Sequence, residues 1–255
     1  MAQAFIADLH LTAERPEAID LFREFLRQAQ GSVENLYILG DLFEYWVGDD
    51  GAKEPEFAPV LAALRRATEY GLSIAVMPGN RDFLLGSDFA RQTGCRLLED
   101  PYALSLYGVA TVLSHGDALC TDDHDYLALR AQFRDPLWQQ HVLSRPLAER
   151  VAMARALRQE SGQATSAKDA AILDVNLTAV TTILDDHRAL RLIHGHTHRP
   201  GQYPAICRHG QAARIVVGDW YEGSSVFTVG PRGMKLTSVA DFPRAITDVM
   251  SRENE

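Results

Sequence analysis

The chain has little cysteine, and no arrangement of it that builds a covalent frame. Three cysteines occur in 255 residues, at Cys95, Cys120 and Cys207, and no two of them form a Cys-x-x-Cys pair. An odd number of widely separated thiols argues against both a disulfide framework and a zinc ribbon. Any metal bound by this chain is therefore expected to use ligands other than thiolates.

The sequence also lacks long hydrophobic runs and an excess of positive charge. No apolar stretch approaches the roughly 20 residues that cross a bilayer. The N-terminus shows no basic and apolar stretches typical of an export signal. A formal net charge of -9 argues against a general nucleic-acid-binding protein. We expect a soluble, cytosolic protein that can still lie on a membrane surface.

What the sequence does contain is an alternation of strand and helix patterns, with 46% hydrophobic residues to form a core. Strand-like runs occupy residues 4–7, 36–39, 72–77, 110–114 and 190–194, and further core strands are expected at 214–217 and 225–229. Residues 16–30 and 57–70 instead carry apolar side chains at helical spacing. The alternation predicts a layered α/β fold, a class that binds ligands outside the carboxyl ends of its strands.

The alternation breaks between residues 121 and 168. Two or three helices are predicted there, interrupted at Pro136, Pro146 and Gly162, and a long helix is predicted at residues 166–187. We therefore expect a single domain over residues 1–240, with a helical insertion at 121–168 that covers the site. Residues 241–255 are expected to form a surface helix and a frayed tail.

This insertion is basic within an acidic chain. Residues 130–168 contain three acidic and seven basic side chains. The basic ones are Arg130, Arg134, Arg145, Arg150, Arg155, Arg158 and Lys168. Such a segment is either a solvated helical face or a contact for an anion or a membrane surface. Four apolar residues on one helical face either line a groove for acyl chains or belong to the core: Leu147, Val151, Ala154 and Leu157.

Five short motifs rich in metal-binding residues follow the strand-like runs. They are Asp8-Leu9-His10, Gly40-Asp41, Gly79-Asn80-Arg81-Asp82, His115-Gly116-Asp117 and Gly195-His196-Thr197-His198. In an extended segment, residues two apart face the same side, so each His or Asp pair at this spacing can grip one ion. Asp41 can bridge two ions or, taken alone, cap a helix. Carboxylate, amide and imidazole donors suit Mn²⁺, Fe²⁺ or Mg²⁺.

The order of these motifs resembles the calcineurin-like metallophosphoesterases, over residues 8–198. The resemblance implies a four-layer fold, in which two packed β-sheets are flanked by helices and the helical insertion forms a lid. It implies that one ion is held by Asp8, His10, Asp41 and His198, and the other by Asp41, Asn80, His115 and His196. It also implies catalytic roles for Asn80, Arg81 and His196.

Longer stretches around the motifs, such as residues 40–46 and 115–123, resemble one branch of this family. That branch hydrolyses the pyrophosphate bond of UDP-2,3-diacylglucosamine to UMP and 2,3-diacylglucosamine 1-phosphate (lipid X) in lipid A biosynthesis. The resemblance implies two divalent ions, with Mn²⁺ preferred, and a lipid-linked nucleotide sugar as substrate. It also implies peripheral binding to the cytoplasmic face of the inner membrane, with no nucleic acid and no obligate protein partner.

The resemblance further implies a set of substrate contacts, namely Asn80, Arg81, Asp123, Ser161, Thr165, Lys168 and His196. Lys168 lies at the start of a predicted helix, where a basic side chain gains nothing from the helix dipole. Asp123 can instead cap a helix, Ser161 can end one, and Lys168 can be an ordinary surface residue.

Arg81 indicates the kind of leaving group. Many family members carry His at this position, where it protonates an alkoxide, and Arg cannot donate a proton at working pH. A phosphate leaving group, with a second pKa of about 6, needs no proton, so Arg81 favours a pyrophosphate substrate. A surface ion pair with Asp82 is the alternative. Other functions left open are a diphosphatase for soluble nucleotide sugars, a cyclic nucleotide phosphodiesterase and a non-catalytic scaffold.

Overall fold

The computed structural model describes residues 1–167, 172–221 and 223–251, and the side chains of residues 162–167 are not described. Lys168 therefore lies outside the described residues, and Thr165 is placed only by its backbone in a helix. Among the described residues, no helix is long and apolar enough to cross a membrane.

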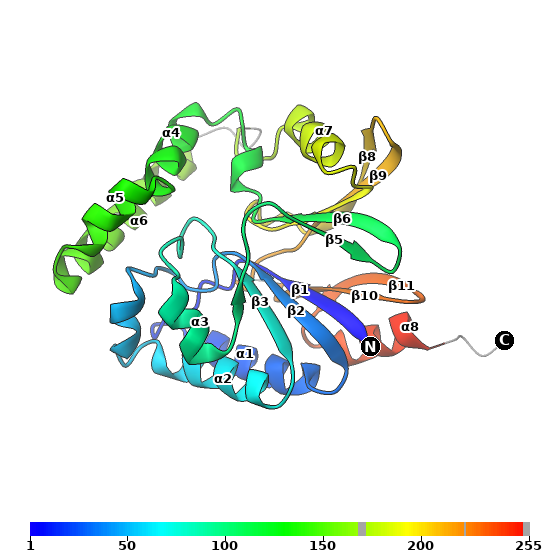
Figure 1. Ribbon diagram of the computed structural model, residues 1–255, viewed down its shortest axis with the longest axis horizontal. Coiled ribbons are helices and arrows are strands. Elements are labelled where there is room, and N and C mark those ends of the chain that lie inside the picture. The colour runs from blue at the N-terminus through cyan, green and yellow to red at the C-terminus, as the bar shows by residue number, and fades with distance from the viewer. Residues whose placement is uncertain (168–171, 222, 252–255) are drawn as a thin grey trace.

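Two mixed β-sheets form the centre of the molecule (Figure 1). The six-stranded sheet has the order β11-β10-β1-β2-β3-β4, with β1 Ala2–Ile6, β2 Val33–Leu39, β3 Ser73–Met77, β4 Arg96–Leu97, β10 Ser225–Gly230 and β11 Gly233–Ser238. The five-stranded sheet has the order β5-β6-β7-β9-β8, with β5 Tyr102–Leu106, β6 Val109–Ser114, β7 Arg191–His194, β8 Gly201–Cys207 and β9 Gly210–Val216. Strands β1 to β4 run parallel, as do β6, β7 and β9.

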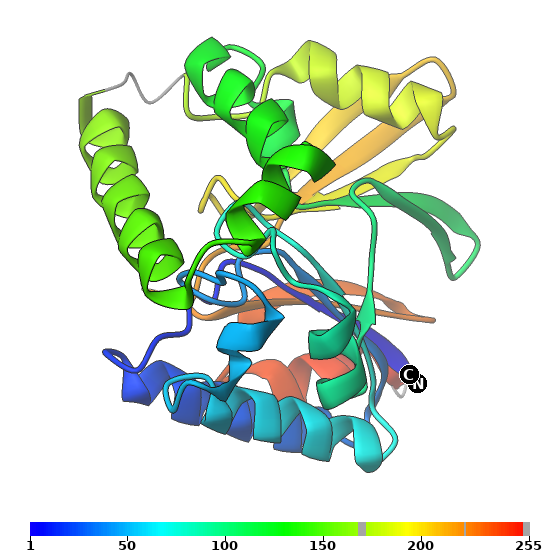
Figure 2. The same ribbon diagram turned by 60° about the vertical axis from the view of Figure 1, so that its left-hand side comes forward.

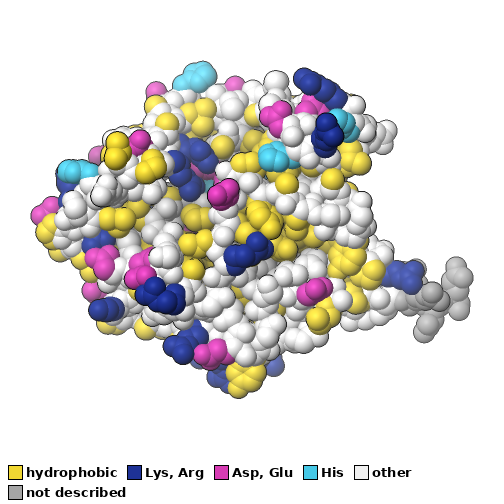
Figure 3. Space-filling model, in the orientation of Figure 1, with side chains coloured by type: hydrophobic (Ala, Val, Ile, Leu, Met, Phe, Trp, Pro, Cys, Tyr) yellow, Lys and Arg dark blue, Asp and Glu magenta, His cyan; other side chains and the backbone are white. Residues whose placement is uncertain are grey.

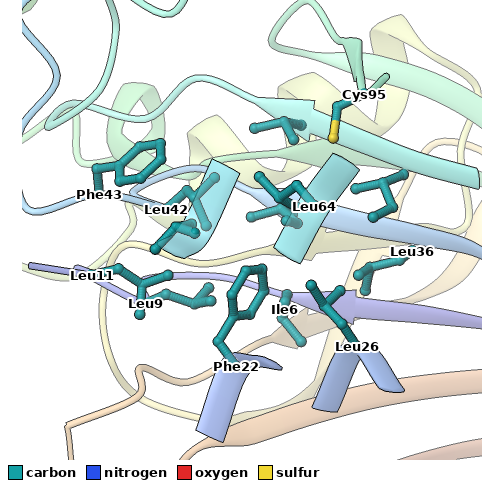
Figure 4. Close-up of a cluster of buried hydrophobic side chains, with 14 of the residues drawn as sticks. Ile6, Leu9, Leu11, Phe22, Leu26, Leu36, Leu42, Phe43, Leu64 and Cys95 are labelled. Atoms are coloured by element: carbon teal, nitrogen blue, oxygen red, sulfur yellow. The ribbon is translucent and has the colours of Figure 1, made fainter. Parts of the chain in front are cut away.

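Helices cover the outer face of each sheet. The six-stranded sheet is covered by α1 Pro16–Ala29, α2 Ala58–Glu69, α3 Ser87–Thr93 and α8 Phe242–Met250, and the five-stranded sheet by α7 Leu177–Asp186 (Figure 1, Figure 2). In Figure 4, Phe22 and Leu26 of α1 pack against Ile6 of β1 in the outer core. Phe5, next along β1, instead belongs to the core between the sheets. This period of two confirms the predicted four-layer fold.

The predicted insertion forms three helices that we call the lid: α4 His124–Phe133, α5 Pro136–Leu143 and α6 Leu147–Ala167. They stand together to one side of the two sheets (Figure 1, Figure 2). Breaks lie before Pro136 and at Pro146, as predicted, because proline disrupts a helix interior but is tolerated at its first turn. Gly162 does not end a helix, and α6 continues through it.

The prediction of one long helix at residues 166–187 is wrong. Helix α6 ends at Ala167, residues 172–174 form a turn and a bend, residues 175–176 are irregular, and α7 begins only at Leu177. The Asn176 side chain caps α7 by accepting bonds from the amides of Thr178 (2.8 Å) and Ala179 (3.3 Å). Val175 is buried in the same cluster as the helix residue Val180. Val175 is thus a buried loop residue that happens to stand at helical spacing from the buried residues of α7, which is why the sequence pattern predicted a longer helix.

Candidate metal centre

The five motifs meet where the strands of both sheets end. Asp8 follows β1, Asp41 follows β2, and His196 follows β7 of the other sheet. The Asp8 amide donates to the carbonyl of Gly40 (3.1 Å), and the His196 amide donates to the Asp8 carboxylate (2.8 Å). The bond between His196 and the Asp8 carboxylate therefore joins two loops that are 188 residues apart in the sequence.

The conformation of these loops differs from the predicted extended segments. Five predicted ligands have left-handed backbone angles, with φ of 55° at Asp8, 47° at His10, 54° at Asp41, 68° at His196 and 53° at His198. This region is unfavourable for residues other than glycine, and such strain clusters at functional sites. The paired side chains do converge, but through tight turns and not through the alternation of a strand.

The glycines of the motifs make room for the carboxylates. A Cβ atom at Gly79 would collide with the Asp41 side chain, and one at Gly195 would collide with that of Asp8. At Gly40, a Cβ would collide with the ring of His115. The recurrent glycine in Gly-Asp, Gly-Asn and Gly-His is therefore a packing requirement of the site itself.

We call Asp8, His10, Asp41 and His198 the first half of the site. Ligand atoms of Asp8, His10 and His198 all lie within 4.8 Å of one another. His10 Nε2 lies 3.9 Å from Asp41 Oδ2, and His198 Nε2 lies 3.7 Å from Asp8 Oδ1. Both Nε2 atoms therefore face the interior of the site. One ion can therefore be reached by two imidazoles and two carboxylates.

Each imidazole of the first half has a carboxylate at its outward nitrogen. Glu44 lies 3.5 Å from His10 Nδ1, and Asp219 lies 3.3 Å from His198 Nδ1. Such carboxylates orient metal-bound imidazoles and raise their basicity. Sequence reasoning assigned no role to either residue. Glu44 lies within a stretch matched to the family, but Asp219 stands in a loop that carries no motif.

The second half comprises Asp41, Asn80, His115 and His196. Asn80 Oδ1 lies 2.9 Å from His115 Nε2 and 3.0 Å from His196 Nδ1, and Asp41 Oδ1 lies 3.7 Å from His115 Nε2. The outward nitrogen of His115 contacts the backbone carbonyl of Leu39 at 2.9 Å. All seven predicted ligands are thus gathered in one place.

The donor set fits two divalent cations. Among the described residues, the buried Asp8 Oδ1 and the inward Nε2 of His10 have no hydrogen-bond partner. Leaving such atoms unpaired is costly unless an ion satisfies them. Asp8 and Asp41 are both buried, and like charges this close need a cation. Oxygen and nitrogen donors without thiolate suit hard or borderline divalent ions.

The metal-free site holds protons that an ion would displace. Burial raises the pKa of Asp41 to about 7. Although burial opposes it, the charges of Asp41 and Asp117 raise the pKa of His115 to about 9. Burial lowers the pKa of His10 well below its ordinary value. His10 is therefore neutral and ready to bind an ion at neutral pH, whereas His115 is not.

Arg81 is directed to the site and not to Asp82. The buried Asp82 carboxylate accepts from the amides of Gly79 (2.7 Å), Leu42 (2.8 Å) and Phe43 (3.3 Å), so it supports the loops. The Arg81 amide donates to Asp41 Oδ1 at 2.8 Å. Its Nε is buried with no hydrogen-bond partner in the described part of the chain. The alternative of a surface ion pair is wrong.

A cavity of about 360 Å³ extends from Asn80 and Arg81 to the lid. Its wall is mainly apolar and includes Trp46, Phe83, Tyr126, Leu129, Phe133, Trp138, Val142, Met153, Ala154 and Leu157. Of the apolar residues predicted to line a groove, Ala154 and Leu157 do so, whereas Leu147 and Val151 are not part of this wall. Asp123 and Ser161 also line it. Apolar side chains gather on the face where lid and sheets meet (Figure 3).

Most lid arginines contact the body of the protein, which contradicts a simple solvated face. Arg130 donates to Asp117 (2.8 Å), and Arg134 donates to the carbonyls of Pro78 and Gly79 (3.0 Å each). Arg150 is buried in an ion pair with Asp50, and Arg158 pairs with Glu44. The positive charge of the lid is thus largely matched by acids and carbonyls around the site.

Comparison with known proteins gives a consistent result. A family model described as calcineurin-like phosphoesterase matches residues 1–200. The chain is 44% identical over 247 residues to UDP-2,3-diacylglucosamine hydrolase of Stenotrophomonas maltophilia (strain K279a), covering 94% of this chain and 99% of the relative. It is 46% identical over 222 residues to the protein of that name from Aromatoleum aromaticum, covering 87% and 90%.

Similarity to solved structures is lower. An archaeal phosphodiesterase is 13% identical with a TM-score of 0.43, over 92% of this chain and 98% of that chain. A dimetal phosphatase from Danio rerio is 15% identical with a TM-score of 0.41, over 94% and 99%.

Proposed function

The chain belongs to the calcineurin-like phosphoesterase family, and we propose that it hydrolyses the pyrophosphate bond of UDP-2,3-diacylglucosamine. The products are UMP and 2,3-diacylglucosamine 1-phosphate, an intermediate of lipid A biosynthesis. One observation carries the choice of substrate: the apolar cavity opens directly at Asn80 and Arg81, where the phosphoryl group must lie. Acyl chains attached to the sugar would fill it, whereas a soluble nucleotide sugar has no group for it. The names of the relatives agree with this choice.

In this proposal the two halves of the site hold two divalent ions, for which we favour Mn²⁺. Bound there, the ions would activate the attacking water and neutralise charge on the phosphoryl oxygens. The neutral ring of His10 is ready for this role, and the shared Asp41 offers one oxygen toward each half. Asn80, which lines the cavity, and His196, whose Nδ1 lies 3.0 Å from Asn80 Oδ1, would also contact the phosphoryl oxygens.

Arg81 has a separate role. An arginine guanidinium supplies positive charge without donating a proton. Charge develops on the leaving phosphate as the bond breaks, and a fixed cation beside it stabilises that charge. The unpartnered Nε of Arg81, among the described atoms, leaves donor capacity for such an oxygen.

The lid would form the binding site for the rest of the substrate, as an insertion at residues 121–168 within a single domain of residues 1–240. Asp123 and Ser161 border the cavity and are proposed to contact the sugar or its amide groups. Asp123 also caps α4 by accepting from the Tyr126 amide (3.1 Å), which fixes its side chain at the cavity edge. Thr165 and Lys168 remain proposed contacts.

A diacylated substrate resides in a membrane, so we propose peripheral binding to the cytoplasmic face of the inner membrane. Leu137 on the lid is 76% exposed, and Leu143 is exposed nearby in sequence. Such binding should be measurable as sedimentation with anionic vesicles at low salt, and it should weaken as salt rises. Failure to sediment at low salt would count against it.

The activity is tested by UMP release from UDP-2,3-diacylglucosamine, with and without Mn²⁺. We expect release that depends on the metal and is far faster than release from UDP-GlcNAc. Equal rates on the two substrates would contradict the lipid-specific proposal and favour a diphosphatase for soluble nucleotide sugars. Lack of both metal binding and metal-dependent hydrolysis would instead indicate a non-catalytic scaffold.

A pair of variants separates the cavity from general surface effects. Leu129→Asn places a polar group in the cavity wall and should raise KM for the diacylated substrate. Leu177→Asn changes an exposed leucine on α7, which is not part of that wall, and should leave KM unchanged. Equal KM values for both variants would contradict an acyl-binding role of the cavity.

A further inference from the structure

Glu44 joins a predicted metal ligand to the lid. One carboxylate oxygen, Oε2, lies 3.5 Å from His10 Nδ1 and accepts from the Tyr221 hydroxyl at 3.1 Å. The other, Oε1, forms an ion pair with Arg158 of α6. Its side chain is only 18% exposed, so solvent screens these contacts weakly. A single carboxylate therefore lies between the first half of the site and a helix that covers the cavity.

The backbone fixes the position of Glu44 relative to His10. The Glu44 amide donates to the carbonyl of Leu11 at 3.2 Å, and the Leu11 amide donates to the carbonyl of Leu42 at 3.0 Å. Leu11 and Phe43 also form an isolated parallel bridge. Because these bonds hold adjacent residues on both segments, only the side-chain torsions of Glu44 are left to be ordered.

Those torsions can be ordered from either side. An ion at the inward Nε2 of His10 would make Nδ1–H a stronger donor and hold Oε2 in place. Arg158 then binds Oε1 at a smaller entropic cost, because the carboxylate is already fixed. By reciprocity, a seated α6 fixes the carboxylate that orients His10.

We propose that Glu44 is a positioning residue that couples divalent-ion binding in the first half of the site to the seating of α6 over the cavity. The proposal rests on the metal-binding role of His10 in the proposed function, but not on the identity of the substrate. It assigns to Glu44 no contact with the reacting atoms.

The lid offers a matched control. Arg150, also on α6, forms an ion pair with Asp50, which lies in a short 3-10 helix (Asp49–Lys53) between β2 and α2. The Asp50 carboxylate is 62% exposed, and no contact with a predicted ligand is recorded for it among the described residues. Asp50→Asn and Glu44→Gln each remove one negative charge that pairs with an arginine of α6. Only the charge of Glu44 also lies next to His10, so Asp50→Asn weakens the attachment of the lid without changing the metal site.

Two measurements on the full chain without substrate test the coupling. The first is Mn²⁺ affinity by calorimetry, which should fall about 10- to 100-fold in Glu44→Gln, as expected for an outer carboxylate, and stay unchanged in Asp50→Asn. The second is amide hydrogen exchange of residues 150–160. Saturating Mn²⁺ should slow this exchange in the wild type and in Asp50→Asn, but not in Glu44→Gln.

Wild-type Mn²⁺ affinity in Glu44→Gln, or retained slowing of exchange by Mn²⁺, would overturn the proposal. If Glu44→Gln does not fold, Arg158→Met breaks the same link from the lid side, and it must lose the slowing by Mn²⁺. Failure of the coupling leaves wild-type Mn²⁺ binding and UMP release intact. Failure of the proposed function would remove one or both of these in the wild type, so the two failures are distinguishable.

Discussion

The two halves of the site use the same number of side chains but surround their ions differently. In the first half, both imidazoles have a carboxylate at the outward nitrogen, Glu44 at His10 and Asp219 at His198. In the second half, the outward nitrogen of His115 contacts the backbone carbonyl of Leu39. Its inward nitrogen contacts the neutral side-chain amide of Asn80. The first half therefore has more carboxylates in contact with its imidazoles than the second half has.

This difference implies that the two ions are bound with unequal affinity. More anionic ligands and better-oriented imidazoles give higher affinity, so the first half should hold its ion tightly. The second half borders the cavity through Asn80, with Arg81 beside it, and should bind its ion more weakly and take part more directly in catalysis. Each prediction below tries to remove or sharpen this asymmetry.

The largest effect is expected from Asp41→Asn, because Asp41 is common to both halves. Its Oδ1 faces His115 and its Oδ2 faces His10. We expect both Mn²⁺ sites to weaken together, with turnover lost by several orders of magnitude, as measured by calorimetry and UMP release. Asp88→Asn, on the exposed surface of α3, is the control. Loss of only one ion would show that Asp41 is not shared.

Arg81→Ala should have the next largest effect. We expect turnover to fall about 10²- to 10³-fold, as it does when one group that stabilises developing charge is lost. Metal content by elemental analysis should stay at the wild-type value, because Arg81 supplies no ligand. Arg81→Lys keeps the charge and should recover part of the rate. An unchanged rate in Arg81→Ala would refute the role of this residue.

Asp219→Asn addresses the first half alone. Because its carboxylate lies 3.3 Å from His198 Nδ1, its loss should weaken the tighter Mn²⁺ site by about 10- to 100-fold. The weaker site should keep its affinity, which a two-site calorimetric titration can resolve. Weakening of the second site to the same degree would mean that the halves are not independent.

The smallest effect is a pH dependence of Mn²⁺ binding at the second half. Although burial opposes it, the charges of Asp41 and Asp117 raise the pKa of His115 to about 9 in the metal-free protein. A proton must therefore leave His115 when Mn²⁺ binds between pH 7 and 9, and affinity at the second half should rise with pH. Calorimetry in buffers of different ionisation enthalpy measures the protons released. An affinity of the second half that stays constant between pH 7 and 9 would contradict this assignment.

Much of the fold and the site could be predicted because it is recorded locally in the sequence. Each of the five motifs follows its own hydrophobic strand, and the glycines that admit the carboxylates stand beside the ligands. What could not be predicted depends on tertiary packing. Val175 mimicked a helix position from a loop, and the lid arginines could not be distinguished from surface charges until their partners, such as Asp50, were placed. Asp219 reaches His198 only through the loop after β9.

A titration of the metal-free protein with Mn²⁺, followed in parallel by calorimetry, electron paramagnetic resonance and UMP release, tests the unequal two-ion site most directly. We predict two binding events of different affinity, a spin-coupled pair once both sites are filled, and turnover that follows the weaker event. A single bound ion, or full turnover when only the tighter site is occupied, would contradict the account.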